Sequence, residues 1–199
     1  MRNVILQDFV SLDGFAAGPN GVDFVPASTA GDRSFGARQM EFIDSVDTML
    51  LGRVTYQMFA GYWPNVESGD DKPFADRLNA MSKVVFSRTL ERAPWGKWDN
   101  ARVSRKSPAD EVQKLKQESG KDMVLWGSLS VAQSLMDEGM IDEYQLIVCP
   151  VVLGSGRPLF GDRIDALKMQ LLDTRSFDRG AVLLSYAAAE AGARALTTR

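Results

Sequence analysis

The stretches Asp47-Thr-Met-Leu-Leu-Gly52-Arg-Val-Thr-Tyr56 and Asp122-Met-Val-Leu-Trp-Gly127-Ser-Leu-Ser130 follow one pattern. In each, a short apolar run ends at a glycine, and a helix-like pattern follows. Glycine lets the backbone approach a ligand closely, and a helix start offers unpaired N–H groups at the positive end of its dipole. Because this combination binds phosphate, the pair predicts a cradle for the pyrophosphate of a dinucleotide. The alternative is that both glycines only turn the chain.

Strand-like apolar runs alternate with helix-like periodic segments along the chain. The predicted strands are Val4 to Val10, Thr48 to Leu51, Lys83 to Phe86, Met123 to Trp126 and Tyr144 to Val152, followed by an antiparallel pair, Lys168 to Asp173 and Ala181 to Ala187. The first predicted helix covers 33–46 and has Phe35, Gln39, Phe42, Ile43 and Val46 on one face. A second helix starts with 54–59, and a third runs from Ser107-Pro-Ala-Asp110 to about Gly120. A fourth is capped by Ser128 or Ser130 and closed by Gly139. This alternation predicts an α/β fold with a mainly parallel sheet, right-handed crossovers and an antiparallel hairpin at one edge.

Size and composition favour one domain with one sizeable core. The chain has 199 residues, of which 45% are hydrophobic, and we expect a domain over 1–187 and a flexible, Ala-rich tail over 188–199. The net charge of -3 argues against a nucleic-acid partner. No apolar run approaches the ~20 residues that span a bilayer, and the amino terminus lacks a signal-peptide pattern. These features predict a cytoplasmic protein without a membrane partner.

The absence of histidine excludes several classes of catalytic and metal-binding site. With no histidine in the sequence, Ser–His and Cys–His catalytic pairs and His-ligated metal sites are excluded. The single cysteine, Cys149, allows no intrachain disulfide and no cysteine-rich zinc site. We therefore expect no metal. Protons must come from carboxylates, tyrosine, lysine, a cofactor or water.

Several motifs together resemble a known superfamily. They are Ser11-Leu-Asp-Gly-Phe15, Leu50-Leu-Gly-Arg-Val-Thr-Tyr56, Val85-Phe-Ser-Arg88, Leu125-Trp-Gly-Ser128, and Met140-Ile-Asp-Glu-Tyr144 with Pro150-Val-Val-Leu-Gly-Ser-Gly-Arg-Pro-Leu-Phe160. In this order they resemble the dihydrofolate-reductase-like superfamily. Within it, the chain is most similar to stand-alone relatives of the reductase domain of the bacterial riboflavin-biosynthesis deaminase/reductase. The zinc motif of the deaminase half needs histidine and cysteine that this sequence lacks.

The resemblance implies an NADPH-dependent reductase with a three-layer fold, in which helices cover both faces of a mixed sheet of about eight strands. It places the cofactor pyrophosphate at Gly52, Arg53 and Thr55, and the adenosine 2′-phosphate near Ser87 and Arg88. It places the nicotinamide side of the pyrophosphate at Gly127, Ser128 and Leu129. Many relatives have Gly-Gly where this chain has Gly127-Ser128. The resemblance also implies a homodimer that pairs through the sheet edge and the C-terminal strands.

Two aspartates are candidate proton donors. Asp13 lies at the end of the first predicted strand, where it would face substrate or, alternatively, form a turn with Gly14. Asp23 would deliver a proton beside an aromatic lid at Phe24, or be an exposed loop carboxylate. A carboxylic acid that donates near neutral pH needs a raised pKa.

Aromatic and basic residues are candidate substrate ligands. Tyr62 and Trp63, with Phe59, would wall a planar heterocycle, or else pack in the core. Arg157, in Gly154-Ser-Gly-Arg157, would bind a substrate phosphate or ribose, or lie in a plain turn between strands.

The sequence predicts hydride transfer from NADPH to a small planar or ribosylated heterocycle, as in 5-amino-6-(5-phosphoribosylamino)uracil reductase or dihydrofolate reductase. Two alternatives stay open. One is a non-catalytic NADPH-binding sensor of the same fold, and the other is a flavin-binding reductase.

Overall fold

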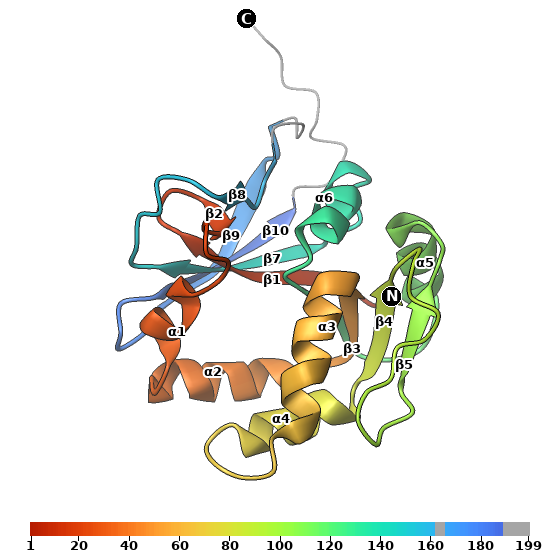
Figure 1. The fold of residues 1–199 in the computed structure, drawn as a ribbon. Coiled ribbons are helices and arrows are strands. Elements are labelled where there is room, and N and C mark those ends of the chain that lie inside the picture. Colours follow the sequence, from red (N-terminus) through yellow and green to blue (C-terminus); the bar gives the residue numbers. More distant parts are fainter. Residues whose placement is uncertain (162–165, 189–199) are drawn as a thin grey trace, which may run out of the picture.

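A computed structural model describes residues 1–161 and 166–188 (Figure 1). The strands are β1 (Val4–Ser11), β2 (Phe15–Ala17), β3 (Val46–Gly52), β4 (Ser82–Phe86), β5 (Ala101–Ser104), β6 (Asp122–Trp126), β7 (Glu143–Cys149), β8 (Arg157–Pro158), β9 (Met169–Ser176) and β10 (Val182–Ala188). The helices are α1 (Phe24–Thr29), α2 (Arg33–Ile43), α3 (Arg53–Tyr62), the 3-10 turn η1 (Trp63–Asn65), α4 (Lys72–Ala80), α5 (Pro108–Lys116) and α6 (Leu129–Asp137).

Eight strands form the central sheet in the order β5-β4-β3-β6-β1-β7-β10-β9, while β2 and β8 pair separately. The pairs from β5 to β7 are parallel, and β10 is antiparallel to both β7 and β9. This confirms the predicted α/β fold with its mixed, mostly parallel sheet and antiparallel C-terminal strands. From β1 the chain continues through α2 to β3, and from β6 it continues through α6 to β7. The connections therefore run in opposite directions across the sheet.

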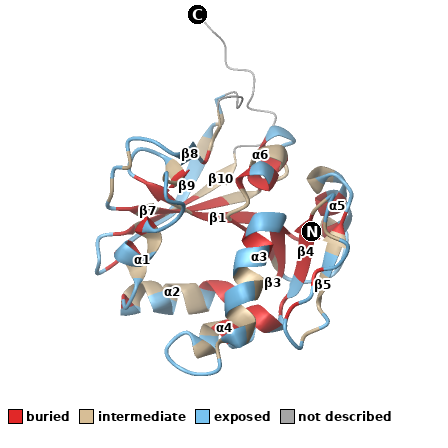
Figure 2. Cartoon of the chain, viewed as in Figure 1, coloured by how far each residue is buried: buried red, intermediate tan, exposed pale blue. Residues whose placement is uncertain are grey.

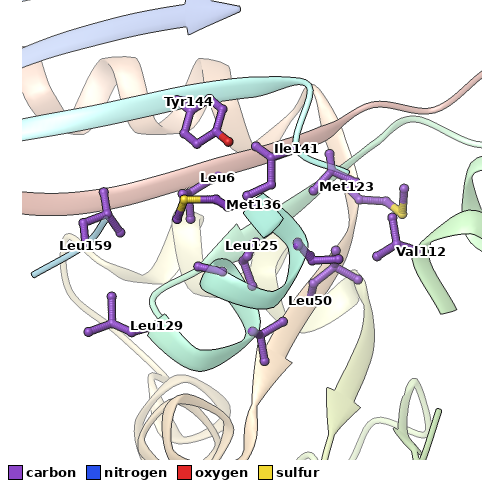
Figure 3. Close-up of a cluster of buried hydrophobic side chains, with 14 of the residues drawn as sticks. Leu6, Leu50, Val112, Met123, Leu125, Leu129, Met136, Ile141, Tyr144 and Leu159 are labelled. Atoms are coloured by element: carbon purple, nitrogen blue, oxygen red, sulfur yellow. The ribbon is translucent and has the colours of Figure 1, made fainter. Parts of the chain in front are cut away.

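The two faces of the sheet carry separate apolar clusters beneath separate helices. Leu6, Leu50 and Leu125 pack against α5 and α6 on one face (Figure 3). Ile5 and Val124 pack with residues of α2, α3 and α4 on the other. Successive strand residues alternate between the faces because side chains in a strand point to opposite sides. The strands between the helical layers are correspondingly buried (Figure 2).

Several element boundaries differ from the sequence prediction. Helix α2 ends at Ile43 instead of residue 46, because Val46 is buried and already belongs to β3. Strand β7 ends at Cys149, before Pro150, which has no N–H to donate to a ladder. The prediction missed α1, α4 and β5 and the short pair β2 and β8. Of the expected tail, Ala188 ends β10, and 189–199 lie outside the described residues.

Candidate functional site

The two glycine junctions lie side by side in the sheet. Strands β3 and β6 are parallel neighbours, so their carboxyl ends meet at one edge. Helix α3 begins at Arg53 directly after β3, and α6 begins at Leu129, two residues after Gly127. Because the connections after β1 and β6 leave over opposite faces, this edge is a switch point of the topology. Open α/β sheets bind ligands in such crevices.

Ser128 connects the two junctions directly. Its Oγ accepts a hydrogen bond from the backbone N–H of Gly52 at 2.7 Å and donates to Oγ1 of Thr55 at 2.9 Å. A Cβ built on Gly52 would lie 3.2 Å from Cβ of Ser128, and one built on Gly127 would lie 3.3 Å from Oγ1 of Thr55. A side chain at either position would therefore press on the other junction, so these glycines also allow the two junctions to pack closely.

The backbone at the second junction is left-handed at two successive residues. Gly127 has φ +53°, and Ser128 has φ +60° and ψ +52°. In the described part of the chain, Ser128 is the one residue other than glycine with positive φ. A serine there costs about 1–2 kcal/mol relative to an ordinary conformation. Strain of this kind persists where the surrounding contacts hold it, and it gathers at functional sites.

Neither helix start at this edge is capped by a side chain. Helix α5 is capped by Ser107, whose oxygen accepts the N–H of Asp110, whereas α3 and α6 have no side-chain cap. Ser128 is the N-cap residue of α6, as predicted, but its hydroxyl makes no cap bond and instead binds across to the first junction. The uncapped first turns leave N–H groups at two adjacent positive helix ends, which suits a diphosphate.

Cationic side chains border the same edge. Arg53 is exposed, and its Nη1 donates to Oε1 of Gln57 at 3.2 Å. Strand β4 lies beside β3, which places Ser87 and the exposed Arg88 at this edge as well. Oγ of Ser87 already accepts the N–H groups of Thr89 and Leu90, at 3.2 and 3.1 Å. The Ser87 hydroxyl thus shapes the turn that presents Arg88.

Asp13 has the geometry of a turn-former. Its carboxylate accepts the Oγ–H of Ser11 at 2.6 Å and the N–H groups of Leu153 and Gly154 at 3.1 and 2.7 Å. These bonds, led by that from Ser11, lower its pKa to about 2. A donor near neutral pH needs the opposite shift, so the structure corrects the assignment of Asp13 as a proton donor. Asp13 instead connects the end of β1 to the 153–154 loop.

The predicted substrate ligands are scattered. Asp23 is exposed at the start of α1, but Phe24 is buried in that helix and forms no open lid.

Tyr62 is the last residue of α3 and lies roughly 15 Å along the helix from Gly52. Its side chain is exposed, and its hydroxyl donates a hydrogen bond to Asp71. Trp63 packs against Phe59 and Phe74 in an aromatic cluster. Arg157 is exposed in β8. The structure therefore supports core packing for Trp63 and does not bring these residues together.

Three buried polar atoms that the sequence did not reveal lie in β1 and α2. In the described ranges, Oδ2 of Asp8, Nε of Arg38 and Oε1 of Gln39 are buried without a hydrogen-bond partner. Burial raises the pKa of Asp8 to about 7. Asp8 follows Gln7, the last β1 residue that pairs with β6. The available signal was the polar pair Gln7-Asp8 inside an otherwise apolar strand, and native proteins contain few such unsatisfied groups.

Other regions carry weaker signals. A wide depression at the opposite edge, where β3 and β4 begin, is lined by charged residues that include the pairs Arg2 with Asp47 and Arg77 with Asp44. Within 1–161 and 166–188, no group of three or more acidic or cysteine side chains is arranged to hold a metal ion. None of the helices described is both long and apolar enough to cross a membrane.

The order and direction of the strands define a dihydrofolate-reductase-like α/β fold. A family model for the RibD C-terminal domain matches residues 2–183, and the chain belongs to this family. It is 35% identical over 188 residues to the uncharacterized protein YyaP of Bacillus subtilis, covering 93% of this chain and 94% of that one.

Solved structures share the fold. A putative riboflavin biosynthesis protein from Shewanella sp. PV-4 superposes with a TM-score of 0.73 at 22% identity, covering 94% of this chain and 99% of that one. The Thermotoga maritima diaminohydroxyphosphoribosylaminopyrimidine deaminase/5-amino-6-(5-phosphoribosylamino)uracil reductase superposes with a TM-score of 0.67 at 15% identity, covering 94% of this chain and 57% of that one.

Proposed function

We propose that the chain is an NADPH-dependent reductase that transfers a hydride to a C=N or C=O group of a small planar or ribosylated heterocycle. The observation that carries this proposal is the interlock of two uncapped helix starts through the Ser128 hydroxyl. Membership of the RibD C-terminal domain family supports it. The uracil reductase activity named for the Thermotoga relative suggests the kind of substrate. The proposed compartment is the cytoplasm, where NADPH is available.

The residues present fit a dinucleotide cofactor in three respects. The glycines at 52 and 127 let the two junctions pack closely, since a Cβ on them would meet the side chains of Ser128 and Thr55 at 3.2 and 3.3 Å. The first turns of α3 and α6 would hold the pyrophosphate, and Arg53 and Arg88 would balance its charge and that of a 2′-phosphate. When bound, the cofactor supplies the hydride, while the protein orients the reacting groups and limits access of water. The accompanying proton must reach the substrate from water or from a carboxyl group.

Cofactor choice tests the role of Arg88. We expect NADPH to bind more tightly than NADH, because exposed Arg88 can pair with a 2′-phosphate that NADH lacks. Replacing Arg88 by alanine should weaken NADPH binding by about 1.5–3 kcal/mol, roughly ten- to hundredfold, and leave NADH nearly unchanged. Titration calorimetry with both cofactors measures this difference. Equal affinities of the wild-type protein for NADPH and NADH would contradict the assignment.

The proton source is tested at Asp23, the candidate that remains after the correction of Asp13. If Asp23 donates the proton, Asp23→Asn should keep its NADPH affinity while turnover falls about a hundredfold or more. Asp13→Asn is the matched control, since that ionised side chain should not affect the protonation step. Normal turnover of the Asp23 variant would assign the proton to water.

The two alternative functions have distinct signatures. A sensor would bind NADPH tightly and show no turnover with pyrimidines, pterins or quinones. A flavin-binding reductase would purify as a yellow protein with flavin absorbance. Either result would replace the reductase proposal.

We also propose that the protein forms a homodimer through β9. This last strand of the sheet is exposed along nearly its whole length, and Leu171 and Leu172 are 52% and 53% exposed. An exposed edge strand is a template for pairing with another chain. Light scattering at micromolar concentration should give the dimer mass, and Leu172→Lys should shift it toward the monomer. A monomeric wild-type protein would refute the proposal.

A further inference from the structure

The hydrogen bonds that connect the two junctions run in one direction. The backbone N–H of Gly52 can only donate, so Oγ of Ser128 is its acceptor at 2.7 Å. The single hydroxyl proton of Ser128 is directed to Oγ1 of Thr55 at 2.9 Å, since the carbonyl oxygen of Trp126 lies farther from it, at 3.3 Å. The chain of donors therefore runs from Gly52 through Ser128 to Thr55.

Thr55 ends this chain with a hydroxyl proton that is not used within the described residues. Its Oγ1 accepts from Ser128, which leaves its own O–H to donate. Serine and threonine hydroxyls in helices often donate to the carbonyl oxygen four residues earlier, as Ser28 and Thr29 do in α1 at 3.0 and 2.9 Å. Over 1–161 and 166–188, Thr55 makes no such bond, although the residue is only 8% exposed. An unused donor at a buried residue is costly.

The position of Thr55 suits an anionic ligand. It lies in the first turn of α3, which has no side-chain cap. The first N–H groups of a helix have no partner within the helix and lie at the positive end of its dipole. The Thr55 hydroxyl adds an O–H donor to these N–H donors. A cluster of donors without an acceptor fits a ligand whose surface consists of acceptors, and phosphate oxygens have this property.

We propose that Ser128 is a positioning residue, which orients the Thr55 hydroxyl so that it donates its proton to a phosphate oxygen of the dinucleotide. This inference rests on the proposed NADPH-dependent function. Hydrogen bonds in a chain polarise one another, so donation from Gly52 to Ser128 and from Ser128 to Thr55 strengthens the last donor. In its left-handed conformation, with φ +60°, Ser128 directs its hydroxyl to the first junction instead of capping α6.

A double-mutant cycle on NADPH affinity, measured by titration calorimetry, tests this role. Thr55→Val removes the last donor and should weaken NADPH binding about tenfold or more, whereas Thr55→Ser should change it by less than about threefold. Ser128→Gly suits the left-handed backbone and should weaken binding about fivefold, because the Thr55 hydroxyl loses its fixed orientation. Combined with Thr55→Val, Ser128→Gly should weaken binding by less than about twofold further, since Ser128 acts through Thr55.

Ser134→Ala is the matched control, because it removes a hydroxyl from α6 beyond its first turn. This variant should leave NADPH affinity unchanged. An additive cycle, in which Ser128→Gly weakens NADPH binding equally with and without Thr55→Val, would overturn the proposal. Ser128 would then only clamp the two helix starts together. Unchanged NADPH affinity of the Thr55→Val variant would overturn it as well.

Inorganic pyrophosphate separates this inference from the choice of cofactor. It carries phosphate oxygens without a nicotinamide or an adenosine, so the variants should change its affinity in the same order as that of NADPH. Wild-type protein that binds pyrophosphate with this order of effects but does not bind NADPH would refute the reductase function and leave the role of Ser128 standing. Wild-type protein that binds neither ligand would overturn both.

Discussion

Replacing Gly127 by alanine is expected to weaken NADPH binding by about a hundredfold or more while the protein stays folded. The new methyl group would sit 3.3 Å from Oγ1 of Thr55, at a residue with φ +53°. Relief of this contact shifts Thr55 by a few tenths of an ångström and so disturbs its hydrogen bond from Ser128 and the alignment of the two helix starts. Loss of a few charge-assisted hydrogen bonds to phosphate accounts for an effect of this size.

Gly139→Ala is the matched control for this prediction. Gly139 also has positive φ, +63°, but a Cβ there would meet nothing within 4 Å, and it lies beyond the far end of α6. Both variants should lose stability from the left-handed alanine, about 1–2 kcal/mol. Only Gly127→Ala should lose cofactor affinity, as measured by titration calorimetry. Equal affinities of the two variants would show that Gly127 serves only the turn.

The sequence predicted the local features of the fold well, because these depend on short-range patterns. Apolar runs ending at Gly52 and Gly127 identified β3 and β6 and the helices that follow. The order of strands in the sheet depends on long-range pairing that periodicity does not record. Only the structure shows that β3 and β6 are neighbours and that the Ser128 hydroxyl reaches Gly52 instead of capping its own helix.

The candidate site was predicted in part, and the errors have a common physical origin. Asp8 and Asp13 are five residues apart, yet burial raises the pKa of Asp8 to about 7, and hydrogen bonds lower that of Asp13 to about 2. Residue type alone cannot distinguish them, since the shift depends on neighbours distant in sequence. The prediction that Tyr62 and Trp63 wall the substrate has a similar origin. The sequence places both residues close to the Gly52 junction, but the length of α3 carries them away from Gly52.

The pH dependence of stability should be dominated at acidic to neutral pH by Asp8. Its carboxyl group keeps a proton up to about pH 7 in the folded protein, against a reference pKa of 3.8. Between these values the folded state binds more protons than the unfolded chain, so the free energy of unfolding falls as pH rises. A pKa shift of this size corresponds to a loss of about 4 kcal/mol between pH 4 and 8.

Asp8→Asn should remove this loss. The amide is neutral at all these pH values, it matches the carboxyl group in shape, and its oxygen can still accept the N–H of Phe9, as Oδ1 of Asp8 does at 2.9 Å. The variant should match the wild-type protein near pH 4 and exceed it by about 4 kcal/mol at pH 8. Urea unfolding followed by tryptophan fluorescence at pH 4.5, 6 and 8 measures this difference, in which contributions from other groups cancel.

Asp137→Asn, at an exposed carboxylate on α6, controls for the loss of one negative charge. Parallel stability curves for wild-type protein and Asp8→Asn would show that Asp8 is ionised in the folded state, with water or a bound cation reaching its buried oxygen.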